Sequence, residues 1–137
     1  MTTSSLSTGS QGDLGLALLR VTSGVFFLIH GLIKVFIFTP AGTAGFFESI
    51  GLPGFMAYVT ILLEVAGGLA LIAGYKTRIV SAVLTFVLLG ALWFGHRSAG
   101  FTFSNAGGGW EYPLFWAIAS AALALTGPGA FAVDKKG

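Results

Sequence analysis

Four long runs of apolar residues, separated by short polar stretches, make up most of this chain of 137 residues. The runs cover residues 14–38, 54–74, 79–94 and 113–126. A helix of about 20 residues is long enough to cross the hydrocarbon core of a bilayer, about 30 Å thick. The pattern therefore predicts four membrane-spanning helices. The fourth run is short, and its helix could begin earlier, at Trp110.

The four runs predict an all-α fold: an integral membrane four-helix bundle with up-down-up-down topology. We expect residues 1–13 to form a disordered N-terminal tail, with Asp13 as the N-cap of the first helix. The bundle domain is expected over residues 14–130, followed by a short cytoplasmic C-terminal tail over 131–137. Residues 1–13 contain no Lys or Arg, so they lack the basic start of a secretory signal peptide.

The composition supports membrane residence, because 55% of the residues are hydrophobic and only 9% are charged. A soluble domain has roughly 25% charged residues. The net charge of +2 is small and its basic residues do not cluster, so nucleic acid is excluded as a partner. The chain has no cysteine, which excludes disulfides, iron–sulfur clusters and thiolate metal sites within it. We predict no metal site.

The basic residues predict the orientation of the bundle. With four spans, both termini and the turn between the second and third spans lie on the same side, which carries Lys76, Arg78, Lys135 and Lys136. The opposite side has Arg97 in a loop and Lys34 near the end of the first span. Because loops rich in Lys and Arg stay inside, both termini are predicted to be cytoplasmic.

Ionisable residues inside the apolar runs are the main candidates for function. Arg20, His30 and Lys34 lie in the first run and Glu64 lies near the middle of the second. Each charge at the centre of a membrane helix costs about 2.5–3.5 kcal/mol on insertion scales, so such groups are paired, hidden or functional. We expect Arg20 to pair with Glu64 and to hold the first two spans together. In the alternative interpretations Glu64 carries a proton or binds a ligand, or is protonated and bonded to Thr60.

Five residues of the first run share one face of its predicted helix. Arg20, Gly24, Phe27, Gly31 and Lys34 follow each other at spacings of four and three residues, which places them on one helix face. Small residues at four-residue spacing in the second run, Ala66, Ala70 and Gly74, predict close contact with another helix.

Titratable and aromatic residues gather at the predicted outer side of the membrane. His30 and Lys34 approach it from the first span, and Trp110 and Glu111 precede the fourth. Together they suggest a quinone-binding site, in which Lys, His or Glu contacts the quinone oxygens and aromatic rings contact its faces. Alternatively, Glu111 stabilises the N-terminus of the fourth helix and Trp110 is an interfacial anchor.

Two histidines at similar depth raise the question of a haem. His30 and His96 both lie about 25 Å from the predicted start of their spans, counted at about 1.5 Å per residue. Histidines on two helices at one level are the axial ligands of b-type haems. We expect the simpler arrangement, in which both bond to backbone groups or water, and therefore no haem.

The order and spacing of several short motifs resemble the DoxX family of small bacterial membrane proteins. The resemblance covers nearly all of residues 14–130. Its motifs are LLRVTSGVFFLIHGLIKVF (18–36), SIGLPG (49–54), LEVAGGLALIAGYKTR (63–78), GGWEYP (108–113) and GPG (127–129).

The resemblance implies four transmembrane helices in the bacterial cytoplasmic (inner) membrane. It also implies an association with redox systems, since the family is named after a subunit linked to a quinone-linked oxidase, and relatives are linked to thiosulfate:quinone oxidoreduction and to thiol or oxidative-stress complexes. Its recurrent polar positions correspond here to Arg20, His30, Lys34, Glu64, Arg78 and Glu111. No catalytic residue follows from it, and without cysteine this chain cannot handle sulfur covalently through a thiol.

We therefore expect an accessory subunit of a quinone-linked or stress-related membrane redox system. Its partners would be the lipid bilayer and other membrane or redox subunits. Its quinone site would involve His30, Lys34, Trp110 and Glu111, with Arg20 and Glu64 as an internal strut or proton relay. The first alternative is a non-enzymatic scaffold or assembly subunit of a larger complex. The second is a small proton-coupled permease in which Glu64 carries the proton.

Overall fold

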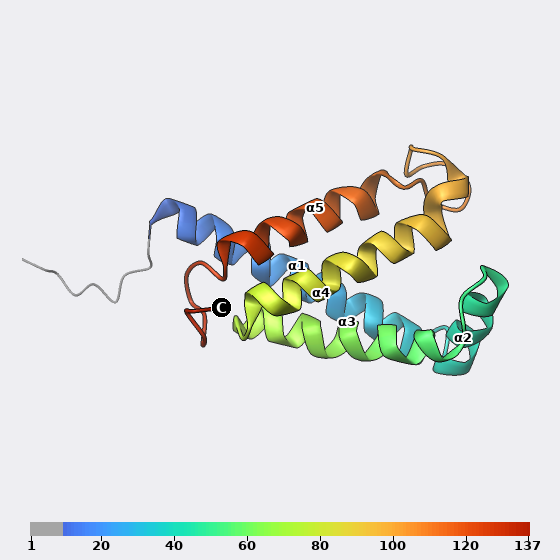
Figure 1. Ribbon diagram of the computed structural model, residues 1–137, viewed down its shortest axis with the longest axis horizontal. Coiled ribbons are helices and arrows are strands. Elements are labelled where there is room, and N and C mark those ends of the chain that lie inside the picture. Colours follow the sequence, from blue (N-terminus) through green and yellow to red (C-terminus); the bar gives the residue numbers. More distant parts are fainter. Residues whose placement is uncertain (1–9) are drawn as a thin grey trace, which may run out of the picture.

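A computed structural model describes residues 10–137, and its regular structure is entirely helical within that range (Figure 1). The all-α class is therefore confirmed, whereas the predicted tail over residues 1–9 lies outside the described residues. The helices are α1 (Gln11–Phe36), α2 (Pro40–Ser49), α3 (Phe55–Ala73), α4 (Thr77–Gly90), the π-helix η1 (Ala91–His96), the 3₁₀-helix η2 (Arg97–Ala99) and α5 (Glu111–Thr126).

Three helical stretches are long and apolar enough to cross a membrane. They are Gln11–Phe36, Phe55–Ala73 and the continuous stretch Thr77–Ala99, which combines α4 with η1 and η2. With 16 residues, α5 is shorter than these three.

The first helix begins earlier than the sequence suggested. Ser10 is the N-cap, and its hydroxyl accepts a hydrogen bond from the Asp13 amide at 3.1 Å. The Asp13 carboxylate accepts one from the Ser10 amide in return, at 3.2 Å. This is a capping box, in which the acidic residue stands three positions after the cap. The prediction of Asp13 as N-cap was therefore wrong by one helical turn, and residues 11–13 are helical.

Two other segments differ from the predicted loops. The stretch after α1 contains the extra helix α2, which starts with Thr39 as N-cap and Pro40 in its first turn. Both residues are ordinary helix-start signals, but the helix has only ten residues and no clear apolar face. The third apolar run, expected to end at residue 94, continues as η1 and η2 to Ala99.

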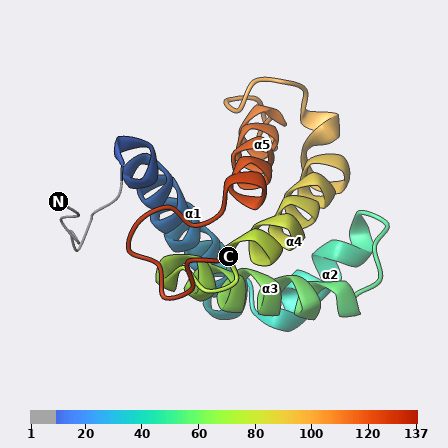
Figure 2. The same ribbon diagram turned by 60° about the vertical axis from the view of Figure 1, so that its left-hand side comes forward.

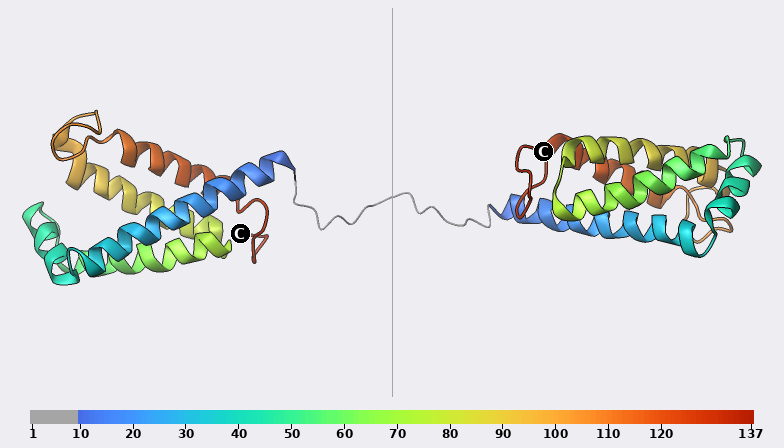
Figure 3. Two further views of the ribbon diagram at one scale, coloured as in Figure 1. Left: turned by 180° about the vertical axis from the view of Figure 1, so that it is seen from behind. Right: turned by 90° about the horizontal axis from the view of Figure 1, so that it is seen from below.

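The long helices form two pairs that meet at one end and diverge at the other (Figures 1 and 3). The first pair is α1 with α3, and the second is α4 with α5. We call the closed end, which carries the start of α1, the α3–α4 turn and residues 127–137, the terminal end. The open end, which carries α2 and the loop over residues 100–110, is called the loop end.

Glycines allow α1 and α3 to approach closely. A Cβ atom at Gly24 would lie 2.8 Å from the Gly68 carbonyl oxygen, and one at Gly68 would lie 2.7 Å from the Leu28 amide nitrogen. Gly31 likewise faces the backbone of Val65. The close contact therefore uses Gly68 rather than the predicted stripe that begins at Ala66, which is exposed.

Residues 127–137 fold back over the terminal end and connect three helices (Figure 2). The Ala130 amide donates to the Asp13 carbonyl of α1, and the Val133 amide donates to Ala73 at the end of α3. The Arg78 amide of α4 donates to the Gly137 carbonyl. The C-terminal segment is thus a structural part of the bundle.

A small apolar core lies between the two pairs. It consists of Phe27, Leu71, Leu84, Leu88 and Ala117. Many large apolar side chains on the outer faces are exposed, for example Leu18, Leu62, Phe115 and Leu125. In water such a surface would be unfavourable, so these faces suit lipid.

Candidate ligand-binding cavity

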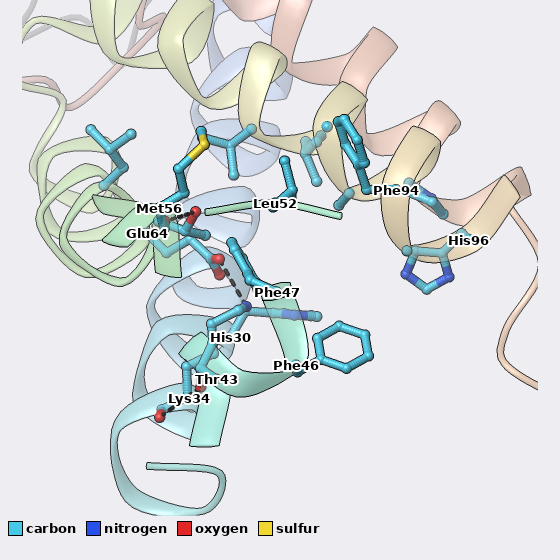
Figure 4. A pocket seen from close by; sticks show the side chains of 18 of the residues that line it. His30, Lys34, Thr43, Phe46, Phe47, Leu52, Met56, Glu64, Phe94 and His96 are labelled. Carbon is cyan, nitrogen blue, oxygen red and sulfur yellow. Dashed lines mark hydrogen bonds and ion pairs between the residues drawn. The ribbon is translucent and has the colours of Figure 1, made fainter. Parts of the chain in front are cut away.

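The divergence of the helix pairs creates a cavity of about 850 Å³ at the loop end (Figure 4). Its walls come from α1, α2, α3, α4, η1 and α5, and most of its lining is apolar. Pockets that bind small organic ligands have volumes of about 300–1,000 Å³ and combine apolar walls with a few polar groups. The cavity is therefore the first candidate for a functional site.

A buried ion pair stands in the wall of this cavity. The Lys34 ammonium lies 2.8 Å from a Glu64 carboxylate oxygen, and their side chains are 20% and 6% exposed. Figure 4 shows the pair on one side of the cavity, with Phe94 and His96 on the other. A lysine has three N–H donors, so Lys34 can bind Glu64 and still donate to another oxygen.

The predicted Arg20–Glu64 pair was wrong, because Glu64 is paired with Lys34 instead. The prediction placed the start of the first span level with the end of the second. In the structure α1 begins well before the end of α3, so Gly31 lies beside Glu64 and Arg20 lies beside the last turn of α3.

Arg20 is completely buried at the terminal end and bonds to backbone carbonyls. Its guanidinium donates to Leu71 at 2.9 Å, to Ala130 at 3.0 Å and to Phe131 at 3.3 Å, and also to Pro128. The carbonyl from the last turn of α3 carries partial negative charge from the helix dipole, which favours a cation there. Arg20 does not line the cavity, so it fastens the C-terminal segment to α1 and α3.

Aromatic residues form the wall between α1 and α5. The Trp116 ring stacks on Phe27 with centroids 4.1 Å apart and lies 5.2 Å from the His30 ring. Its indole nitrogen is buried and has no hydrogen-bond partner among the described residues. A smaller recess of about 400 Å³ shares residues of this wall and is lined by Phe26, His30, Phe103, Tyr112 and Trp116.

His96 connects the cavity to the loop over residues 100–110. Its Nδ1 lies 2.6 Å from the Gly108 carbonyl oxygen, and its Nε2 lies 3.4 Å from the Tyr112 hydroxyl. Both ring nitrogens therefore have partners in the protein. His96 and His30 line the same cavity, as their similar predicted depth suggested.

The structure separates the four residues of the predicted quinone site. His30 and Lys34 line the cavity, but Trp110 and Glu111 do not. The Glu111 carboxylate accepts a hydrogen bond from the Phe103 amide at 3.0 Å, and the Trp110 ring packs edge-on against Phe101. These two residues hold the loop against the start of α5.

Sequence reasoning missed several residues of the cavity wall. Tyr112 stands in the GGWEYP motif directly after Trp110 and Glu111, which were predicted for the quinone site. Trp116 follows one helical turn later. The cavity residues of α2, such as Phe47, could not be found because α2 itself was not predicted.

The π-helix η1 and the glycines near it widen the cavity. Gly90, Ala91, Phe94, Gly95 and His96 all line it. A Cβ atom added at Gly90 or Gly95 would meet no heavy atom within 4 Å, so both glycines face open space. Single π-helical turns are rare and occur frequently at functional sites.

Comparison with known proteins is consistent with this architecture. The sequence profile of the DoxX family matches residues 15–97. This chain belongs to the DoxX family. It is a membrane protein, and the apolar outer faces of its helices contact lipid.

Relatives of this DoxX protein cover nearly its whole length. It is 40% identical to a Bacillus subtilis protein named "Putative oxidoreductase CatD". The match extends over 122 residues, which are 89% of this chain and 86% of the relative. It is 35% identical to "Inner membrane protein YqjF" of Escherichia coli. This match extends over 130 residues, which are 90% of this chain and 92% of the relative. A third relative, "Inner membrane protein YphA" of Escherichia coli, is 29% identical over 135 residues, 93% and 94% of the two chains. No solved structure matches.

Proposed function

We propose that this DoxX protein is the quinone-binding membrane subunit of a redox system, with the quinone ring in the loop-end cavity. The observation that carries this proposal is the Lys34–Glu64 ion pair in the wall of an otherwise apolar cavity of about 850 Å³. A quinone combines the same two properties, because its apolar ring and tail carry two oxygens. The name of one relative, "Putative oxidoreductase CatD", agrees with a redox role.

The polar groups of the cavity fit the two oxygens of such a ring. Lys34 has N–H donors beyond the one that faces Glu64, and the carboxylate of Glu64 can accept a hydrogen bond from a hydroxyl group. The buried indole N–H of Trp116 has no partner among the described residues. A carbonyl oxygen of the ligand would satisfy that donor, whose desolvation otherwise costs about 1–3 kcal/mol.

A membrane-dissolved ligand can reach the cavity from the side. Val59 of α3 and Phe86 of α4 both line the cavity and are exposed, Phe86 at 74%. An isoprenoid tail lying between these side chains would remain in lipid while the ring occupies the cavity.

The proposal includes a location and an orientation. We place the protein in the bacterial inner membrane, as the names of two relatives suggest for those proteins. In this arrangement α5 is the fourth crossing, the termini are cytoplasmic and the loop end faces outward, because Lys76, Arg78, Lys135 and Lys136 lie at the terminal end.

Cysteine labelling tests the orientation directly, since the natural chain has no cysteine. Lys135 and Asn105 are exposed at opposite ends of the molecule. An impermeant maleimide added to intact spheroplasts should label Asn105→Cys and leave Lys135→Cys unlabelled until the membrane is opened. Labelling of Lys135→Cys alone would show that the orientation is the opposite of the proposed one.

Quinone binding is tested with a pair of matched glycine variants. Gly90 faces the cavity and Gly15 lies on the exposed side of α1 at the terminal end, and both have free space where a side chain would begin. Phe at position 90 fills the cavity, whereas Phe at position 15 points into lipid. The protein in lipid nanodiscs would be titrated with short-chain ubiquinone and menaquinone analogues, and binding followed by quenching of tryptophan fluorescence.

We expect the wild type and Gly15→Phe to bind one of these quinones with the same affinity. Gly90→Phe should bind at least about tenfold more weakly, because the lost contacts exceed about 1.4 kcal/mol. Equal affinity in both variants would place the quinone elsewhere. Absence of saturable binding in the wild type would reject the proposal.

A further inference from the structure

Tyr112 and His96 form a connected pair between the cavity and the loop surface. The Gly108 carbonyl oxygen can only accept a hydrogen bond, so His96 Nδ1, 2.6 Å away, carries the hydrogen. A neutral imidazole then has a free lone pair at Nε2. The Tyr112 hydroxyl, 3.4 Å from Nε2, donates its hydrogen to it.

This arrangement is that of an oriented base. The backbone carbonyl fixes the tautomer and the orientation of the ring, and the basic nitrogen faces a hydroxyl group. Tyr112 and His96 both line the cavity, so a ligand there can reach the Tyr112 oxygen, while the Gly108 carbonyl belongs to the loop over residues 100–110. The pair thus connects the interior of the cavity with the loop end of the molecule.

We infer that the Tyr112–His96 pair takes a proton from an acidic hydroxyl group of the cavity ligand, so that the site acts on the hydroquinone form. The inference rests on the proposed function for the ligand class. The ligand O–H bond breaks and its proton moves to the Tyr112 oxygen, while the Tyr112 proton moves to His96 Nε2. The products are a ligand oxyanion and an imidazolium, and no electron is transferred in this step. The imidazolium then releases one proton to water at the loop end.

The charges around the pair support the two products. Lys34 stands in the wall of the same cavity and favours the oxyanion, and Glu64 offsets part of its charge. Arg97, next to His96, is directed away, with its guanidinium 4.0 Å from the centroid of the Trp93 ring. The charged and titratable groups around the pair, apart from its own two members, are His30, Lys34, Glu64, Arg97 and Glu111.

The proton transfer can be measured with a phenol that changes colour when it ionises. A 4-nitrophenol with a short alkyl chain resembles one half of a hydroquinone, and its phenolate absorbs visible light. The probe would be bound to the protein in nanodiscs at saturating protein concentration and titrated between pH 5 and 10. Saturation ensures that only bound probe is compared, whatever the affinity of each variant.

In the wild type the bound probe should ionise at a pH about 1–2 units below that of the free probe, because both His96 and Lys34 favour the anion. In His96→Gln, which cannot accept a proton, most of this shift should disappear. Tyr112→Phe should remove the same part of the shift, because it removes the hydroxyl through which His96 stabilises the bound anion. In Gly15→Phe, at the far end of the molecule, the shift should equal that of the wild type.

Three outcomes distinguish the inference from the proposed function. Loss of the shift in both His96→Gln and Tyr112→Phe supports the inference. A shift that persists in both variants overturns it and leaves Lys34 as the cause, with the cavity proposal intact. If the wild type binds neither the phenol nor a quinone, the proposed function fails and the inference with it. If one variant does not fold, the other decides.

Discussion

The two ends of the molecule use buried cations in opposite ways. At the terminal end, Arg20 has no exposed surface, and four backbone carbonyls accept its hydrogen bonds. At the loop end, Lys34 is 20% exposed, has one carboxylate partner and borders a cavity. Both lie on α1, fourteen positions apart in the printed sequence. A cation held by four backbone carbonyls holds structure together, whereas one with a single partner beside a cavity can also bind a ligand.

The largest loss of stability is expected from Arg20→Leu. The substitution leaves four carbonyls without their donor in a buried site and releases the C-terminal segment from α1 and α3. At about 1–3 kcal/mol for each unsatisfied group, the free energy of unfolding should fall by more than about 3 kcal/mol. Chemical unfolding in detergent micelles measures this change.

Arg78→Leu is the matched control for this prediction. Arg78 also donates to backbone carbonyls, those of Leu125 and Thr126, but it is exposed. Water can replace its hydrogen bonds, so the loss should be about 1 kcal/mol or less. Equal losses in the two variants would show that burial is not what distinguishes Arg20.

Next in size is the contrast between Gly68→Ala and Gly90→Ala. The new methyl group at position 68 would lie 2.7 Å from backbone atoms of α1, so the helices must separate, at a cost of about 1–3 kcal/mol. At position 90 the methyl group enters open space, and the higher helix propensity of Ala should raise stability by up to about 1 kcal/mol. Thermal unfolding of both variants gives the comparison, and a strongly destabilised Gly90→Ala would contradict an open cavity.

A double-mutant cycle on Lys34 and Glu64 comes third. Either single change to Gln removes the ion pair and leaves the other group without its partner, so each should lower stability by about 1–3 kcal/mol. The double variant has no unpaired charge in the cavity wall. Its loss of stability should therefore be smaller than the sum of the losses in the two single variants. Additive losses would mean that the pair at 2.8 Å contributes no coupling energy.

The smallest effect is expected from Ser10→Ala. The substitution removes the capping hydroxyl at the start of α1, where the backbone is exposed, and typical losses are about 1 kcal/mol. Ser10→Asp, which retains an N-cap acceptor, is the control and should stay close to the wild type. Unfolding in detergent measures both variants. A loss as large as that of Arg20→Leu would show that the cap, and not the guanidinium, governs the terminal end.

The long helices could be predicted because long apolar runs are typical of membrane-spanning helices. The four-and-three spacing placed residues 20, 24, 27 and 31 on one face of α1, and the structure shows that this face is buried. The extra helix α2 was missed because ten residues without a clear apolar face give little periodic signal.

The partners of the buried cations were less predictable. Arg20 binds backbone carbonyls, and carbonyls have no signature in the sequence. Choosing between Arg20 and Lys34 as the partner of Glu64 also requires the axial offset between α1 and α3, which glycine contacts determine in three dimensions. The three-dimensional packing also decides that Tyr112 and Trp116 line the cavity, whereas Trp110 and Glu111 do not.

The contacts of Arg20 also impose an order on the synthesis of this protein. Its hydrogen-bond partner Phe131 is 111 residues further along the chain, and at about 5–20 residues per second a ribosome needs roughly 6–22 seconds to cover that distance. During this interval the guanidinium lacks the carbonyls of Pro128, Ala130 and Phe131. The terminal end therefore closes only after all the long helices have been made, and α1 enters the membrane with a charge whose permanent partners do not yet exist.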